Sequence, residues 1–321
     1  MPLAAPHYTG RLFFARYYRA SRIFAASPVC LITRACVAGS AAFAPLLFQI
    51  ISYFRFLVRS GNAHGLHSPF VFGLYAHVIN HTGHFAAYEA VEARRRELLT
   101  DPTRIQVRDF GAGSRTGAGR QRRLRDIART AAKPPKLGQL LFRLVNQFQP
   151  RTVVELGTSL GLTTAYLSAA NSRARVLTFE GCPATAEVAR ETFQSLGLAN
   201  IRLVEGNLDD TLAPTLATLA EPVDFAFFDG NHRYEPTLRY FEQLNQHRSE
   251  HSVFVLDDIH WSGEMERAWE AIRQHPDVTL TLDLFYIGLV FFRRNQPKQH
   301  FTLRFDHVVD KVLEASIRLS S

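Results

Sequence analysis

The sequence predicts an α/β protein built on a doubly wound, mostly parallel sheet of seven strands. From residue 152 onward, apolar runs typical of buried strands alternate with helical segments. Such alternation favours right-handed βαβ crossovers, which place helices on both faces of a parallel sheet. The last two apolar runs lie too close together for a crossover, so we expect an antiparallel hairpin at the sheet edge. The expected strands are 152–156, 175–180, 201–207, 223–230, 252–258, 278–285 and 288–294.

Composition narrows the class of protein. The chain has 321 residues, of which 46% are hydrophobic and 21% charged, as in ordinary globular proteins. The net charge of +8 is compatible with a nucleic-acid or membrane partner, but nearly all basic residues are arginine, which a GC-rich genome also explains. Nucleic acid is therefore not the expected partner. The three cysteines show no paired spacing, which favours a reducing, cytoplasmic location.

The first 135 residues divide into two regions. Residues 1–45 combine arginine with aromatic residues and alanine, and we expect a helical N-terminal extension that is either disordered or associated with a membrane surface. Residues 46–135 are expected to form a helical cap that contributes to the substrate pocket. The segment 46–58 is expected to form a helix packed on the domain. A second helix is expected after it, with Ser68 as its N-cap and Pro69 at its first position. Further helices are expected at 88–100 and at 138–148, and the last of these leads into the core domain.

Two features of the cap region have open interpretations. His77, His81 and His84 are spaced to share a helix face, but no acidic residue accompanies them, so ordinary histidines are expected rather than a metal site. The glycine-rich segment DFGAGS at 109–114 reads as a basic connecting loop, with closure over a substrate as the alternative. The core domain is expected to span 136–305, with a C-terminal helix over 306–321.

A glycine turn follows the first core strand. The spacing E-x-G-x-x-x-G comprises Glu155, Gly157 and Gly161, with Thr158 and Ser159 between the glycines. Glycines let a ligand approach the backbone, and the N–H groups of the next helix attract an electronegative group. The turn is neither the dinucleotide fingerprint nor a P-loop. The turn therefore indicates a binding site for a nucleotide-like cofactor, although glycines also occur in such turns for steric reasons alone.

Polar residues follow the other core strands. In a doubly wound sheet, ligands bind beyond the carboxyl ends of the strands, so these residues are candidates for the site. Glu180, followed by Gly181, lies about 20 residues after the turn, where a carboxylate can bind ribose hydroxyls. Carboxylates that converge repel one another unless a hard cation such as Mg²⁺ binds between them. The remaining candidates are Asn207 and Asp209 beside an adenine, and Asp229, Asp257 and Asp258 around a metal ion.

These residues together resemble those of class I S-adenosylmethionine-dependent methyltransferases, particularly the metal-dependent O-methyltransferases of the catechol/caffeoyl-CoA and macrolide-sugar type. The resemblance implies a Rossmann-like methyltransferase fold, with ELGTSLG (155–161) at the methionine part of the cofactor and Glu180 at its ribose. It also implies Mg²⁺ held by Asp229, Asp257 and Asp258. A likeness to bacterial class I methyltransferases is also carried by the stretches HGLHSPF, DGNH and DDIHWS. This likeness extends from about residue 46 to residue 305.

Two departures from the resembled family affect the expected chemistry. His232 stands where the catechol group has a lysine as general base, and Asp258 stands where it has asparagine. Histidine can accept a proton near neutral pH, so we expect His232 to deprotonate a substrate hydroxyl, with Asp229 also catalytic. His260 and Trp261 are candidates to line the substrate pocket, and core packing is the alternative for Trp261.

The expected function is methylation of a small hydroxylated molecule such as a phenol, a catechol or a sugar. Two alternatives stay open: a metal-independent class I methyltransferase, and a non-catalytic RNA- or membrane-binding protein on the same fold. The absence of an N/D-P-P-Y motif counts against amino methylation of adenine or glutamine. The sequence does not fix the oligomeric state, and a dimer is one option.

Overall fold

The computed structural model describes residues 40–62, 66–108, 120–294 and 296–305. The chain divides into two compact units, residues 1–51 and 52–321, and of the first only the beginning of helix α3 (Ser40–Arg59) is described. The predictions for residues 1–39, for the glycine-rich loop and for a C-terminal helix lie outside the described residues. Among the helices of the described ranges, none is long and apolar enough to cross a membrane.

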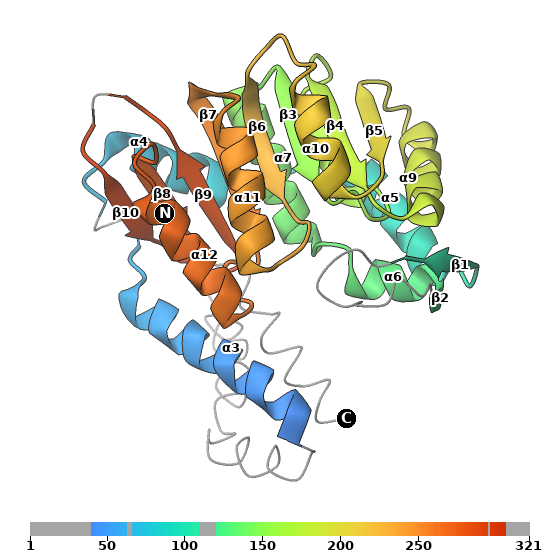
Figure 1. Cartoon of the computed structure of the whole chain (residues 1–321), viewed down its shortest axis with the longest axis horizontal. Coiled ribbons are helices and arrows are strands. Elements are labelled where there is room, and N and C mark those ends of the chain that lie inside the picture. Colours follow the sequence, from blue (N-terminus) through green and yellow to red (C-terminus); the bar gives the residue numbers. More distant parts are fainter. Residues whose placement is uncertain (1–39, 63–65, 109–119, 295, 306–321) are drawn as a thin grey trace, which may run out of the picture. The chain divides into compact units, whose positions relative to one another are not determined.

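A sheet of eight strands forms the centre of the second unit (Figure 1). The strand order is β10-β8-β9-β7-β6-β3-β4-β5. Only β9 runs antiparallel to its neighbours in this sheet, which confirms the predicted mostly parallel architecture with a hairpin near its end. The strands are β3 (Thr152–Leu156), β4 (Arg175–Glu180), β5 (Ile201–Glu205), β6 (Val223–Phe228), β7 (Arg248–Asp257), β8 (Leu280–Asp283), β9 (Ile287–Phe291) and β10 (Gln299–Thr302).

Helices cover both faces of the sheet, and alternate strand residues divide between two apolar clusters. Phe225 and Phe227 of β6 join the cluster that includes α7 and α8, while Ala226 and Phe228 join the cluster of α10, α11 and α12. Figure 1 shows the latter three helices in front of the sheet and α7 behind it. The helices are α7 (Pro135–Phe148), α8 (Leu162–Ala170), α9 (Pro183–Ser195), α10 (Leu208–Leu216), α11 (Tyr234–Asn245) and α12 (Gly263–Gln274).

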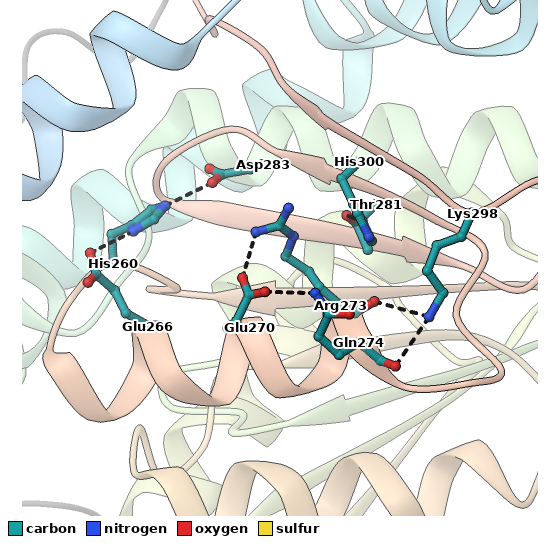
Figure 2. A network of polar contacts seen from close by, with 9 residues as sticks. All are labelled: His260, Glu266, Glu270, Arg273, Gln274, Thr281, Asp283, Lys298 and His300. Atoms are coloured by element: carbon teal, nitrogen blue, oxygen red, sulfur yellow. Dashed lines mark hydrogen bonds and ion pairs between the residues drawn. The ribbon is translucent and has the colours of Figure 1, made fainter.

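The sheet has one strand more than predicted. Strand β10 pairs in parallel with β8, so the hairpin of β8 and β9 is not the edge of the sheet. The Thr281 hydroxyl lies 2.8 Å from His300 Nδ1 across this added pair. Lys298, just before β10, donates to the carbonyl groups of Arg273 and Gln274 at the end of α12, at 3.4 and 3.2 Å (Figure 2). It also donates to the carbonyl group of His275, which follows the helix, at 2.7 Å. The four residues of β10 are only half-buried and too few to form a periodic pattern, so no strand was predicted there.

The residues before the core domain are also mostly helical. Ser68 accepts from the Val71 amide and Pro69 opens α4, as predicted. Residues 104–107 and 120–123, for which no strand was predicted, pair as a small antiparallel sheet. Side chains of α4, η3, α5 and α6 belong to the same apolar cluster as α7 and α8. The elements are α4 (Pro69–Leu74), the π-helix η3 (Tyr75–Ile79), α5 (Ala86–Thr100), β1 (Arg104–Val107), β2 (Arg120–Arg123) and α6 (Leu124–Thr130).

Candidate active site

The glycine turn lies between β3 and α8 against the end of β6. Gly157 has φ +101°, and a Cβ there would lie 2.7 Å from the Asp229 carbonyl oxygen. Gly161 has φ +80°, and a Cβ there would lie 2.7 Å from the Phe193 ring of α9. Both positions therefore require glycine for the packing of the protein itself. The same contacts bring the turn beside Asp229, so the predicted cofactor residues and the predicted acidic site are adjacent.

Glu155 is fully buried behind this turn. One carboxylate oxygen accepts from the hydroxyl groups of Thr164 and Thr178, and the other has no hydrogen-bond partner among the described residues. Burial raises the pKa of Glu155 to about 8, so the carboxyl group is mostly neutral at pH 7. In this arrangement Glu155 supports the turn from within the core.

Glu180 lies at the end of β4 and faces the turn. Its two oxygens accept from the backbone N–H groups of Ser159, at 2.8 Å, and Cys182, at 2.9 Å. Burial raises the pKa of Glu180 above its ordinary value, and these backbone hydrogen bonds oppose the shift. Each oxygen has a second lone pair, so the carboxylate can still accept a hydrogen bond from a ligand hydroxyl.

Asn207 and Asp209, predicted beside an adenine, lie at the start of α10. Asn207 caps the helix by accepting from the Asp209 amide at 3.3 Å. The Asp209 carboxylate accepts from the Tyr240 hydroxyl and from Arg239, each at 2.6 Å. These contacts tie α10 to α11, and a role at the adenine stays a prediction.

Asp229, His232 and Asp257 come together beyond the ends of β6 and β7. Each can direct a ligand atom to a common point, and these atoms lie within 4.8 Å of one another. His232 Nε2 is 3.5 Å from Asp229 Oδ1. Burial lowers the pKa of His232, but the hydrogen bond and charge of Asp229 outweigh it and raise the pKa above its ordinary value. Among the described residues this is the group of acidic, histidine or cysteine side chains that is arranged to hold a metal ion.

Lys133 inserts its ammonium group between the two carboxylates. Its Nζ lies 2.8 Å from Asp229 Oδ1 and also contacts Asp257 Oδ2. Burial lowers the pKa of Lys133, but the nearby carboxylates outweigh this effect and raise it well above its ordinary value. The lysine therefore stays protonated, and only 11% of its side chain is exposed.

Sequence reasoning missed Lys133 because the residue lies more than 90 positions before either carboxylate. It stands in the connection between α6 and α7, where no motif marks it. One signal was available: lysine is rare in this arginine-rich chain, and this one directly precedes Pro134 and Pro135. A lysine at such a constrained position is a candidate for a specific contact.

The other predicted site residues lie outside this group. Asp258 has φ +52° and is not in the group that converges on one point, although its charge contributes to the raised pKa of His232. His260 is held between Glu266 and Asp283, at 3.0 and 2.9 Å (Figure 2). Trp261 is 56% exposed, so core packing is not its role. The group that could hold a metal ion does not include His77, His81 or His84.

The fit to the two expected ligands differs. The turn suits S-adenosylmethionine, since α8 begins without a side-chain cap and Glu155 keeps an oxygen without a partner beneath the turn. For Mg²⁺ the oxygen donors are suitable in kind, but the Lys133 ammonium already lies between them. The residues as they lie do not accommodate a metal ion in addition to that ammonium group.

Comparisons with known proteins agree with the sequence resemblance. Residues 154–259 match the family model described as a methyltransferase domain. A catechol O-methyltransferase of Mycobacterium tuberculosis is 34% identical over 140 residues, which cover 41% of this chain and 61% of that protein. A second, from Niastella koreensis, is 26% identical over 133 residues, covering 41% and 59%. The chain thus spans about three fifths of the length of these relatives.

A solved structure is also similar. An O-methyltransferase from Bacillus cereus, in complex with SAH, aligns with a TM-score of 0.48 and 18% identity, over 69% of this chain and 96% of the other. The segment that matches the methyltransferase-domain model, residues 154–259, includes the glycine turn, Glu180 and the group of Asp229, His232 and Asp257.

Proposed function

We propose that the protein transfers a methyl group from S-adenosylmethionine to a hydroxyl group of a small molecule. One observation supports this most directly: the glycine turn of a methyltransferase domain packs against Asp229, which belongs to the buried group with His232 and Asp257. A cofactor in the turn would therefore lie next to a charged site that can bind and activate an acceptor.

The cofactor would lie along the carboxyl ends of β3 and β4. The N–H groups at the start of α8 would receive its electronegative groups, and Glu180 would accept from its ribose hydroxyls. When bound, S-adenosylmethionine supplies a methyl group on a positively charged sulfur, which is already activated for transfer. The remaining task of the protein is to orient and deprotonate the acceptor.

We assign the role of proton acceptor to His232, whose Nε2 lies 3.5 Å from Asp229 Oδ1. The hydroxyl proton of the acceptor would pass to the imidazole as the oxygen forms its bond to the methyl carbon. The bond between that carbon and sulfur breaks, its electron pair stays on sulfur, and S-adenosylhomocysteine leaves. A phenol, a catechol or a sugar offers such a hydroxyl, and the two curated relatives are named as catechol O-methyltransferases.

A magnesium-dependent form of the reaction is the second candidate. It would need Asp229 and Asp257, with Asp258, to exchange the Lys133 ammonium for the ion. The metal-independent form needs no such exchange. We also propose a cytoplasmic location, because Cys182 is a buried free thiol.

Calorimetry with a matched pair of variants tests the cofactor assignment. Glu180→Gln removes the ribose-binding charge, so we expect S-adenosylmethionine affinity to fall at least about tenfold. Glu205→Gln is the control, because Glu205 lies opposite Glu180 in the strand register but contacts Arg190 on the surface. Equal binding by both variants and the wild type would remove Glu180 from the cofactor site.

Methyl transfer is tested separately. Methyl-labelled S-adenosylmethionine is incubated with the protein and a set of catechols, phenols and sugars, and labelled product is separated and identified. We expect the label on an acceptor oxygen. Cofactor binding without transfer to any hydroxylated molecule would argue against the acceptor class while leaving the cofactor assignment intact.

A further inference from the structure

The carboxylates of the expected metal site already share a cation that belongs to the chain. Lys133 Nζ contacts Asp229 Oδ1 and Asp257 Oδ2, which follow neighbouring strands of the sheet. Asp257 is 1% exposed and Asp229 14% exposed in their side chains, so both negative charges are largely shielded from water. Two carboxylates in such a place require a compensating positive charge.

An ammonium group and a divalent ion cannot occupy this point together. A magnesium ion lies about 2.0–2.1 Å from its oxygen ligands, so an ion bound by both carboxylates would lie between them. Lys133 Nζ takes that place. Their positive charges would also repel at this separation. Binding a metal therefore requires the lysine side chain to leave.

The backbone around Lys133 fixes the point from which its side chain extends. Pro134 follows directly, and a residue before proline is confined to extended conformations. The Pro134 carbonyl accepts from the amides of Leu137 and Gly138, which joins it to the first turn of α7. At Gly138 an added Cβ would lie 2.6 Å from the Tyr166 ring, so α7 packs tightly on α8. The backbone of Lys133 is thus joined to α7, which packs on α8, the helix that follows the glycine turn.

We propose that Lys133 is the resident cation of the acidic site and replaces the divalent metal ion there. Its ammonium group pairs with both Asp229 and Asp257 and offsets one of their two negative charges. An ammonium group has three N–H donors, so one remains to donate to an acceptor oxygen beside His232. Such a hydrogen bond would favour the deprotonated form of the acceptor hydroxyl, which is the role expected of the metal ion. The catalytic part of the inference rests on the proposed function, whereas the occupation of the site by the lysine does not.

Manganese binding tests the occupation directly. Mn²⁺ is titrated into the full chain and the free ion is followed by electron paramagnetic resonance. We expect no saturable binding at this site in the wild type. Lys133→Met keeps an unbranched side chain one atom shorter and frees the two carboxylates, so it should bind Mn²⁺ at least about tenfold more tightly than the wild type. The double variant K133M/D257N should lose this binding.

Lys136→Met is the matched control. Lys136 lies three positions further on, is exposed in the first turn of α7, and its replacement removes the same charge from the same segment. It should bind Mn²⁺ like the wild type. Equal Mn²⁺ affinity of the wild type and K133M would overturn the proposal, as would tight binding by the wild type. If K133M fails to fold, as judged by circular dichroism, the wild-type titration still decides the question.

An activity measurement provides the second arm. Wild-type protein stripped of metal with a chelator should keep its methyl transfer, and K133M should lose it and regain part of it when Mg²⁺ is added. Wild-type turnover that depends on added Mg²⁺ would contradict the proposal. Calorimetry with S-adenosylmethionine on the same samples separates the two hypotheses, because absence of cofactor binding would refute the proposed function and leave the Mn²⁺ result valid.

Discussion

At the scale of single residues, environment decides the role of identical side chains. Glu180 and Glu205 lie opposite each other on β4 and β5. Glu180 is partly buried and accepts backbone hydrogen bonds from the glycine turn, whereas Glu205 pairs with Arg190 near the surface. Asp229 shows the same principle at the site, where one of its oxygens is shared by Lys133 and His232. Such sharing orients the side chains of both Lys133 and His232.

His232 is predicted to act as the general base. His232→Ala should lower turnover about 10²–10⁴-fold while leaving S-adenosylmethionine affinity nearly unchanged. Since Asp229 raises the pKa of His232, the neutral form that accepts a proton gains population as pH rises above 6.5, so wild-type turnover should rise with pH in that range. Steady-state kinetics across pH provide the measurement.

The control for this prediction is His251→Ala, because the His251 side chain is 85% exposed on β7. It should retain both turnover and pH profile. If His232→Ala turned over at the wild-type rate at every pH, His232 would not be the general base.

At the scale of elements, polar networks hold the added edge of the sheet. His260, just after β7, bridges Glu266 of α12 and Asp283 of β8 (Figure 2). Its ring stacks on that of Phe285, with the ring centroids 5.2 Å apart. On the same helix, Glu270 forms an ion pair with Arg273. Lys298, just before β10, donates a hydrogen bond to the carbonyl group of His275 at the C-terminal end of this helix. These contacts join α12 to β8 and β10.

The His260 network should make stability depend on pH. Burial lowers the pKa of His260, but Asp283 and Glu266 outweigh it and raise the pKa to about 9 from 6.5. The folded state therefore retains a proton that the unfolded state releases, so the stabilisation is complete below pH 6.5 and is lost as pH rises to 9. The shift corresponds to about 3 kcal/mol at most.

Denaturant unfolding between pH 6 and 10 measures this effect. His260→Gln should reduce the decline in unfolding free energy over that range, because the glutamine side chain does not titrate. His251→Gln serves as the control and should keep the wild-type decline. A His260→Gln profile parallel to that of the wild type would show that the network does not hold a proton.

At the scale of the molecule, the helices before the predicted core domain share its apolar core. Val71, Tyr88 and Leu124 are buried in the same cluster as Leu140 of α7 and Leu289 of β9. Arg143 of α7 is buried as well and donates to the carbonyl groups of Val78 and Ile79 at the end of η3. The boundary predicted at residue 136 therefore runs through a continuous packed region.

A truncation tests the consequence. A chain of residues 136–305 would expose the apolar face of α7 and α8, so we expect it to bind a hydrophobic dye and to lack cooperative thermal unfolding. A chain of residues 52–305 should unfold cooperatively and serves as the control. Cooperative unfolding of the shorter chain would establish an independent domain. The shorter chain also lacks Lys133, so its acidic site has lost that cation.

The sequence alone determined the order of elements and the residues that follow each central strand. Burial on both faces requires continuous apolar runs, and these are visible locally in β3, β6 and β7. The glycine turn and the acids at strand ends followed from the same local pattern. Strand β10 and the pair β1 and β2 escaped prediction because they are short and only partly apolar.

The tertiary structure decided which side chains meet. Asp229 and Asp257 come together because their strands are neighbours in the sheet, as the topology of the class allowed us to expect. Lys133 reaches them from a connection more than 90 residues away in the chain, and no local pattern encodes that contact. Sequence fixes local conformation and burial, whereas the partner of a buried charge depends on packing between distant segments. The cation of this site is therefore a property of the fold.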